Sequence, residues 1–185
     1  MDFTLDEHDL SWRTRRRLSS WAGYLDRSGA YGGPGGADVS DGEIEIVFAP
    51  EGRDNSPLTD DELELVQWFL DNEPAVSAAA KSVIFEEYPN LIETYGYTPE
   101  ERAELMPDIA GPEDLRSLIG LYAVNVHQIR SGAAPYLGFE FGCTWDEEHS
   151  LGVLLHGTRP VAIGGADTAF LLWIARQDAH AQAAS

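Results

Sequence analysis

The chain is poor in three features that would each point to a particular class of protein. Its single cysteine, Cys143, excludes an internal disulfide and a zinc site built from several cysteines. No apolar run approaches the roughly 18 residues that a membrane-spanning helix needs. The first residues, MDFTLDE, are acidic and lack the basic-then-apolar order of a signal peptide. Together these absences predict a cytoplasmic protein of bacterial type.

Positive charge is also scarce. Only 12 Lys and Arg residues stand against 32 Asp and Glu, Lys81 is the one lysine, and the formal net charge is −20. Binding to nucleic acid or to an anionic membrane needs a basic surface, so neither partner is expected. The excess of acid favours encounter with a basic protein partner, and the alternative explanation is simple solubility.

Sequence motifs of common enzyme classes are missing as well. The chain contains no P-loop, dinucleotide-binding fingerprint, HExxH pair or internal repeat. An enzyme is therefore the less favoured class, and no cofactor is expected apart from a divalent metal, considered below.

What is present suits one folded domain. The 185 residues are 43% hydrophobic and 10% aromatic, enough to bury a substantial core. We therefore expect a single domain over residues 1–185.

The first part of the chain predicts two strands separated by a loop. Residues 11–24, which include RTRRR at 13–17, are expected to form an edge strand whose arginines face solvent or nearby acids. Residues 29–43, GAYGGPGGADVSDGE, predict a glycine-rich loop that is mobile or functional. Residues 43–49 alternate polar and apolar side chains and predict the second strand.

The middle of the chain predicts helices. Thr59 and Glu62 form a capping box at the start of a helix over residues 58–71, and a second helical run begins near Pro74 and is interrupted at Pro89. A similar signal at Thr98 predicts a short helix through residue 106, and residues 112–116 predict one more turn.

The last third predicts a meander of strands at residues 117–130, 136–143, 151–156 and 160–163. A closing helix is expected after residue 165, with Asp167 as its N-cap and a buried face of Phe170, Trp173 and Ile174. The tail from about residue 178 should fray. This order predicts an α+β fold, in which an antiparallel sheet of N-terminal strands and a C-terminal meander packs against several helices.

The most distinctive stretch, GFEFGCTWDEEHSLGVLLHG at residues 138–157, contains the connection between two strands of this meander. Alternation places Cys143 in the core with Phe139 and Phe141, where a lone cysteine acts as a small hydrophobic residue. Trp145 is expected to fold back over the sheet. The sequence therefore predicts a binding site at this turn, whose residues are Trp145, Asp146, Glu147, Glu148 and His149.

A metal site is the alternative at the same turn. Asp146, Glu148 and His149 offer carboxylate and imidazole ligands within four residues, and His127 or Asp167 could approach them across the sheet. A bound metal would activate water for hydrolysis.

The motif also resembles that of a known family. The stretch YLGFEFGCTWDEEHSLGVLLHG, followed by AIGGADTAFLLWIA, is similar to a family of uncharacterised bacterial proteins with the motif GFExGCTWDEEHGLGV and a later GGAD element. The resemblance extends through LMPDIAGPEDLRSLIGLYAVNVH, DNEPAV and SSWAGY, and so covers most of the chain. The glycine after the motif histidine is Ser150 here, which suggests a turn that tolerates a side chain. The resemblance implies one domain and assigns no activity.

Three functions follow as hypotheses. The first is an acidic cytoplasmic binding protein that docks onto a cationic protein, for example as an immunity protein beside a toxin, by analogy with small acidic proteins of toxin loci. The second is a metal-assisted hydrolase that uses Asp146, Glu148 and His149. The third is a housekeeping structural domain.

Overall fold

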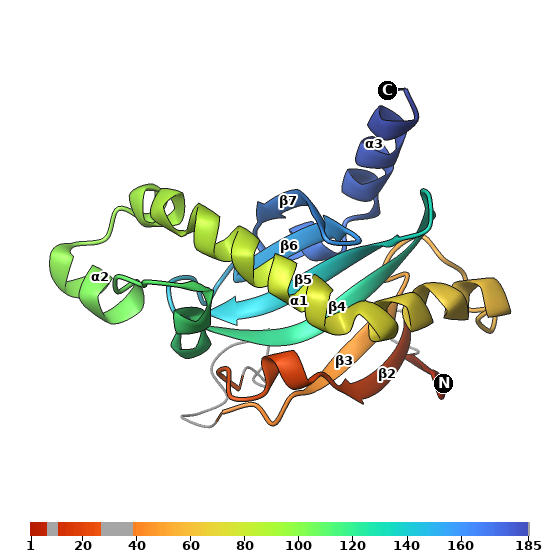
Figure 1. Cartoon of the computed structure of the whole chain (residues 1–185), viewed down its shortest axis with the longest axis horizontal. Coiled ribbons are helices and arrows are strands. Elements are labelled where there is room, and N and C mark those ends of the chain that lie inside the picture. Colours follow the sequence, from red (N-terminus) through yellow and green to blue (C-terminus); the bar gives the residue numbers. More distant parts are fainter. Residues whose placement is uncertain (7–10, 27–38, 185) are drawn as a thin grey trace.

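A seven-stranded sheet forms the centre of the computed structural model, which describes residues 1–6, 11–26 and 39–184 (Figure 1). The strands lie side by side in chain order: β1 (Thr4–Asp6), β2 (Ser11–Arg17), β3 (Glu43–Phe48), β4 (Ile119–Arg130), β5 (Pro135–Cys143), β6 (Leu151–His156) and β7 (Arg159–Gly164). All neighbours are antiparallel except β3 and β4, which are parallel and are joined through the helical middle of the chain. The α+β prediction is confirmed.

One long helix, α1 (Asp60–Tyr95), crosses one face of this sheet (Figure 1). The predicted capping box starts it: the Thr59 side chain accepts from the Glu62 backbone N–H at 3.3 Å, and the Glu62 carboxylate accepts from the Thr59 N–H at 2.8 Å. The helix ends at Gly96, whose φ of 59° suits a residue without a side chain.

The predicted break within this region is wrong. The two expected helical runs form one helix of 36 residues that contains both Pro74 and Pro89. Each proline removes a backbone hydrogen bond, which costs about 3 kcal/mol in a helix interior. Both prolines are on the exposed side of α1. The apolar residues on either side of Pro74 pack into the same core, and this shared burial keeps the helix continuous.

Shorter helical segments follow α1. The second capping box, formed by Thr98 and Glu101, begins α2 (Pro99–Leu105) as the sequence predicts. The expected turn at residues 112–116 is the 3-10 helix η3 (Pro112–Ser117). Another 3-10 helix, η1 (Ser19–Trp21), follows β2 and buries Trp21 completely.

The main core lies between α1 and the sheet. Strand alternation buries Phe139, Phe141 and Cys143 of β5, as predicted, and Leu137 lies in the same core with residues of α1. The helix contributes mainly Val66, Phe69, Val76, Ala80, Ile84 and Tyr88, each at most 2% exposed. A smaller cluster packs on the opposite face of the sheet around Tyr136, Leu154 and Ala175.

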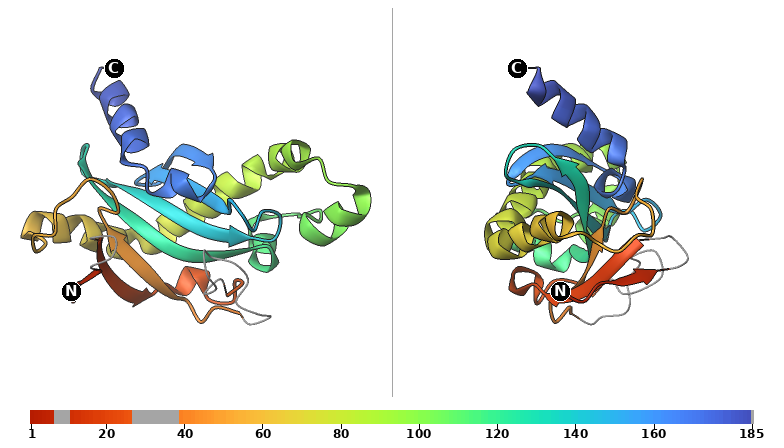
Figure 2. Two further views of the ribbon diagram at one scale, coloured as in Figure 1. Left: turned by 180° about the vertical axis from the view of Figure 1, so that it is seen from behind. Right: turned by 90° about the vertical axis from the view of Figure 1, so that its right-hand side faces the viewer.

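The closing helix differs from its prediction. Asp167 lies in the 3-10 helix η4 (Ala166–Ala169), and α3 (Leu172–Ala183) begins only after it with Leu171 as N-cap. In this helix Leu172 and Ala175 are buried, whereas Trp173, which was expected to be buried, is 57% exposed. Figure 2 shows η4 and α3 on the side of the sheet away from α1.

Helix α3 continues to Ala183, through the tail that is predicted to fray. Asp178 holds this part of the helix to the sheet: its carboxylate accepts from the Tyr136 hydroxyl at 2.7 Å and pairs with Arg159 at 2.5 Å. Gln182 donates to the same carboxylate one turn later.

The N-terminal strands are close to their prediction. Part of residues 11–24 forms β2, and its arginines meet acids as expected, with Arg13 bound to Glu45 and Arg17 to Asp41. β2 is the predicted edge strand only in part, because β1 pairs with its first half. Residues 29–38 of the predicted glycine-rich loop at 29–43 lie outside the described residues. Within the described part of the chain, no helix is long and apolar enough to cross a membrane.

Candidate functional site

The turn between β5 and β6 is organised by Asp146. Its carboxylate accepts hydrogen bonds from the backbone N–H groups of Glu148 at 3.1 Å and His149 at 2.8 Å, and from the Tyr95 hydroxyl at 2.6 Å. Burial opposes ionisation of Asp146, but these hydrogen bonds and the nearby His149 outweigh it and hold its pKa below the usual value. Asp146 therefore fixes the shape of the turn and ties it to the end of α1.

Trp145 is buried, as the sequence predicts. The indole is 2% exposed and packs edge-on against Tyr88 of α1, with 5.7 Å between ring centroids. Its backbone carbonyl accepts from the Tyr97 hydroxyl at 2.5 Å. This side chain stabilises the hairpin and is not available to contact a partner.

Glu147, Glu148 and His149 are the exposed members of the predicted site. The His149 side chain is 71% exposed, and its Nδ1 lies 3.3 Å from the Asp146 carboxylate. His127 lies elsewhere: it is buried in β4, and its Nε2 is 2.9 Å from the Ala169 carbonyl of η4. Burial lowers the pKa of this histidine. Among the described residues, no group of three or more His, Cys, Asp or Glu side chains is placed to hold a metal ion.

The turn belongs to an acidic end of the molecule, which also contains the end of α1 and α2 (Figure 1). Tyr95 and Tyr97 bind the turn as described above, and the Thr144 hydroxyl donates to the Leu105 carbonyl at 2.6 Å. These contacts gather exposed carboxylates from three segments. They are Glu93, Glu100, Glu101, Glu104, Asp108, Glu147 and Glu148.

A cleft adjoins the acidic end, between the second half of α1 and residues 102–109. Its walls are mostly apolar, and Glu86, Arg102 and Asp108 also line it. Arg102 pairs with Asp108. The apolar lining residues are Phe85, Tyr88, Pro89, Ile92 and Ile109. The cleft combines an apolar floor with charged groups, as protein-binding pockets do.

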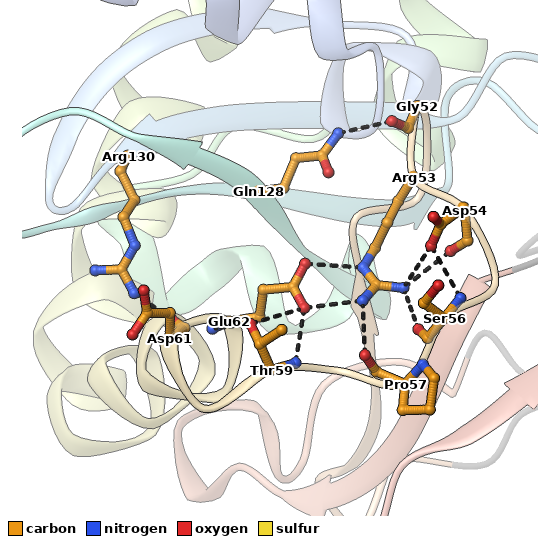
Figure 3. A network of polar contacts seen from close by, with 10 residues as sticks. All are labelled: Gly52, Arg53, Asp54, Ser56, Pro57, Thr59, Asp61, Glu62, Gln128 and Arg130. Atoms are coloured by element: carbon orange, nitrogen blue, oxygen red, sulfur yellow. Dashed lines mark hydrogen bonds and ion pairs between the residues drawn. The ribbon is translucent and has the colours of Figure 1, made fainter.

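A dense polar network at the start of α1 is structural (Figure 3). Arg53, whose side chain is 8% exposed, binds both carboxylate oxygens of Glu62 at 2.9 and 2.8 Å. Its remaining N–H groups donate to the backbone carbonyls of Asp54, Ser56 and Pro57. The guanidinium N–H groups thus bind acceptors in the segment between β3 and α1 and in the first turn of α1. Arg53 therefore fixes this segment against the start of the helix.

The sheet face away from α1 carries a second candidate site, which the sequence reasoning missed. Two neighbouring depressions there share Arg13, Glu45 and Tyr122 as lining residues, and we call them together the far-face pocket. Asn125 of β4 and Glu140 of β5 line the second depression, and Asn125 Nδ2 lies 3.4 Å from Glu140 Oε2.

Glu140 is the unusual residue of the far-face pocket. Burial raises its pKa and the nearby Glu45 adds to the rise, although Asn125 and Arg13 partly oppose it. A carboxyl group with a raised pKa in a pocket is typical of functional sites. The available sequence signal was a single acid in the middle of the otherwise apolar strand YLGFEFGC.

Comparisons with known proteins identify the family. Neither the curated proteins nor the solved structures gave a match. A family model described as a domain of unknown function, DUF6985, matches residues 21–171 and so includes the sheet from β3 to β7, α1 and the β5–β6 turn. The chain therefore belongs to the DUF6985 family.

Proposed function

We propose that this protein is an acidic binding protein of the bacterial cytoplasm that docks its acidic end onto a basic protein, as an immunity protein does with a toxin. One observation carries the proposal: the fold places an apolar cleft beside exposed carboxylates in a chain of net charge −20. The single cysteine, buried in the core, suits a reducing compartment.

The two parts of this surface have different roles in binding. The carboxylates of α2 and the β5–β6 turn attract a positively charged partner over a distance and raise its association rate. The cleft between Phe85, Ile92 and Ile109 accepts an apolar side chain of the partner, because desolvated apolar pockets provide most of the affinity of an interface.

Within this proposal, the exposed residues of the predicted site contact the partner, and the less exposed ones have a structural role. Glu147, Glu148 and His149 face the partner, whereas Trp145 and Asp146 hold the turn in place.

A pair of charge-matched variants tests the proposal. The first replaces Glu93, Glu104 and Glu148 of the acidic end by Gln, and the second replaces Asp2, Asp60 and Asp71, which lie elsewhere, by Asn. Each removes three negative charges. The immobilised wild type should retain basic proteins from a bacterial lysate, and identified partners should then be purified and their Kd measured at two salt concentrations.

The acidic-end variant should bind a purified partner at least about tenfold more weakly, and the control variant should bind like wild type. An Ile92→Ala, Ile109→Ala double variant should weaken binding at both salt concentrations, since its effect is apolar. Equal weakening by the two charge variants, or partners without positive charge, would refute the proposal.

A further inference from the structure

We propose that the far-face pocket is a binding site for a small organic cation, a molecule of about amino-acid size that carries a primary ammonium or guanidinium group. This site is on the sheet face away from α1 and is independent of the acidic end.

The charge of the pocket selects a cation. The second depression is lined by one basic residue, Arg13, and two acidic residues, Glu45 and Glu140. Arg13 is already bound to Glu45 at 2.6 Å and lies 3.5 Å from Asp6. In the described part of the chain Glu140 forms no ion pair, and its contact with Asn125 is long at 3.4 Å. A ligand cation would supply the missing partner.

The other lining groups suit such a ligand. Asn125 is 2% exposed and Ser11 is 2% exposed, so each presents a polar side chain that is largely shielded from water. Tyr122 and Phe170 also line the depression. Aromatic faces attract ammonium and guanidinium groups through their quadrupoles, with a strength that grows as water is excluded. A volume of about 420 Å³ is in the usual range for small-molecule sites.

Two glycines in the sheet allow η4, which precedes Phe170 in the pocket wall, to lie close to β5 and β6. A Cβ atom at position 138 would lie 1.7 Å from the Ala169 carbonyl oxygen, and one at position 152 would lie 2.4 Å from the Gly165 oxygen. Only glycine at these two positions allows η4 to pack against β5 and β6. Phe170 follows η4 directly and reaches the pocket from this position.

Calorimetric titration of the whole chain tests the site. The probes are agmatine and putrescine as cations, glutarate as an anion of similar length, and an arginine tripeptide blocked at both ends. We expect saturable binding of at least one of the two cations and no binding of glutarate. Absence of saturable binding by both cations, glutarate binding of equal strength, or binding of the tripeptide alone would overturn the proposal.

Two variants that each remove one negative charge show whether the cation binds in the far-face pocket. Glu140→Gln keeps the shape of the side chain and removes the negative charge, and it should weaken cation binding about tenfold or more. Glu148→Gln removes one charge at the acidic end and should leave the affinity unchanged. Thermal unfolding of Glu140→Gln checks that the variant folds, which is expected because the change removes a buried charge. Equal affinity of Glu140→Gln and wild type would also overturn the proposal.

Discussion

At the scale of single residues, Ser150 occupies a backbone conformation that favours glycine. Its φ is 57°, and it is largely buried where the turn enters β6. A side chain in the left-handed region costs roughly 1–2 kcal/mol, which glycine avoids. The backbone of this turn therefore favours glycine over serine at position 150.

We therefore predict that Ser150→Gly stabilises the protein. The free energy of unfolding in urea should exceed that of Ser150→Ala by about 1 kcal/mol, because alanine keeps the strain and glycine removes it. Because both variants lack the serine hydroxyl group, the difference between them reports the backbone strain alone. A glycine variant no more stable than the alanine variant would show that the turn carries no such strain.

Asp146 gives a second prediction at this scale. Asp146→Ala should lower the free energy of unfolding by about 1–3 kcal/mol, since the N–H groups of Glu148 and His149 and the Tyr95 hydroxyl lose their acceptor. Glu147→Ala and Glu148→Ala should each change it by about half a kcal/mol or less, because both side chains are exposed. Similar losses in all three variants would contradict this division of roles.

These residues show how far the sequence could predict the site. Alternation along β5 correctly predicted that Cys143 is buried, and the sequence correctly located the turn between β5 and β6. The role of Asp146 depends on Tyr95, which is 51 positions away in the chain, and no local pattern reports such a contact. The far-face pocket was missed for the same reason, because Asn125 and Glu140 meet only through strand pairing.

At the scale of elements, capping boxes predicted helix starts more reliably than prolines predicted where a helix is interrupted. The capping boxes at Thr59 and Thr98 start α1 and α2 as expected, because each is a short-range hydrogen-bond pattern. Pro74 and Pro89 predicted interruptions that do not occur, because burial of α1 against the sheet is a tertiary effect. The start of α3 was misplaced because η4 intervenes.

The start of α1 should show a characteristic dependence on pH. The Arg53 hydrogen bonds, together with those from Thr59, outweigh burial and lower the pKa of Glu62 to about 2, from its ordinary value of 4.5. Because the folded pKa is depressed, this carboxylate stabilises the fold above pH 4.5, and its contribution is lost as the pH falls through about 2.

Glu62→Gln isolates this contribution, since glutamine can still complete a capping box. At pH 7 the variant should be about 2–3 kcal/mol less stable than wild type, because the buried Arg53 loses its charged partner. The difference should shrink toward zero near pH 2, measured by urea unfolding across the pH range. Glu101→Gln in the exposed capping box of α2 is the control and should have a much smaller effect. A difference independent of pH would refute the ionic explanation.

At the scale of the whole molecule, the two faces of the sheet are used differently. One face and α1 form the main apolar core, whereas the other carries a smaller apolar cluster and a polar pocket between the N-terminal strands and η4. Alternation along β5 predicted the apolar face, because Phe139, Phe141 and Cys143 occupy every second position of that strand. The polar pocket on the other face follows no such rule. Its polar residues come together in a pocket only when the strands pair, so the sequence alone did not reveal it.

The net charge of −20 also acts on the molecule as a whole. Exposed carboxylates gather at the acidic end, and their mutual repulsion opposes the folded state more than the expanded one. Salt screens exposed charges separated by more than the Debye length, which falls from about 30 Å at 0.01 M to about 8 Å at 0.15 M. The Arg53–Glu62 pair is largely buried and is screened much less.

Added NaCl should therefore stabilise the protein. Between about 0.01 and 0.3 M salt at pH 7, the Tm should rise by at least about 3 °C, which corresponds to roughly 1 kcal/mol for a domain of this size. KCl at equal ionic strength should have the same effect, because screening does not depend on the cation. The acidic-end variant with three Gln residues should have a higher Tm in low salt and a smaller response to NaCl. A Tm that falls with salt would mean that surface ion pairs such as Arg17–Asp41 outweigh the repulsion between carboxylates.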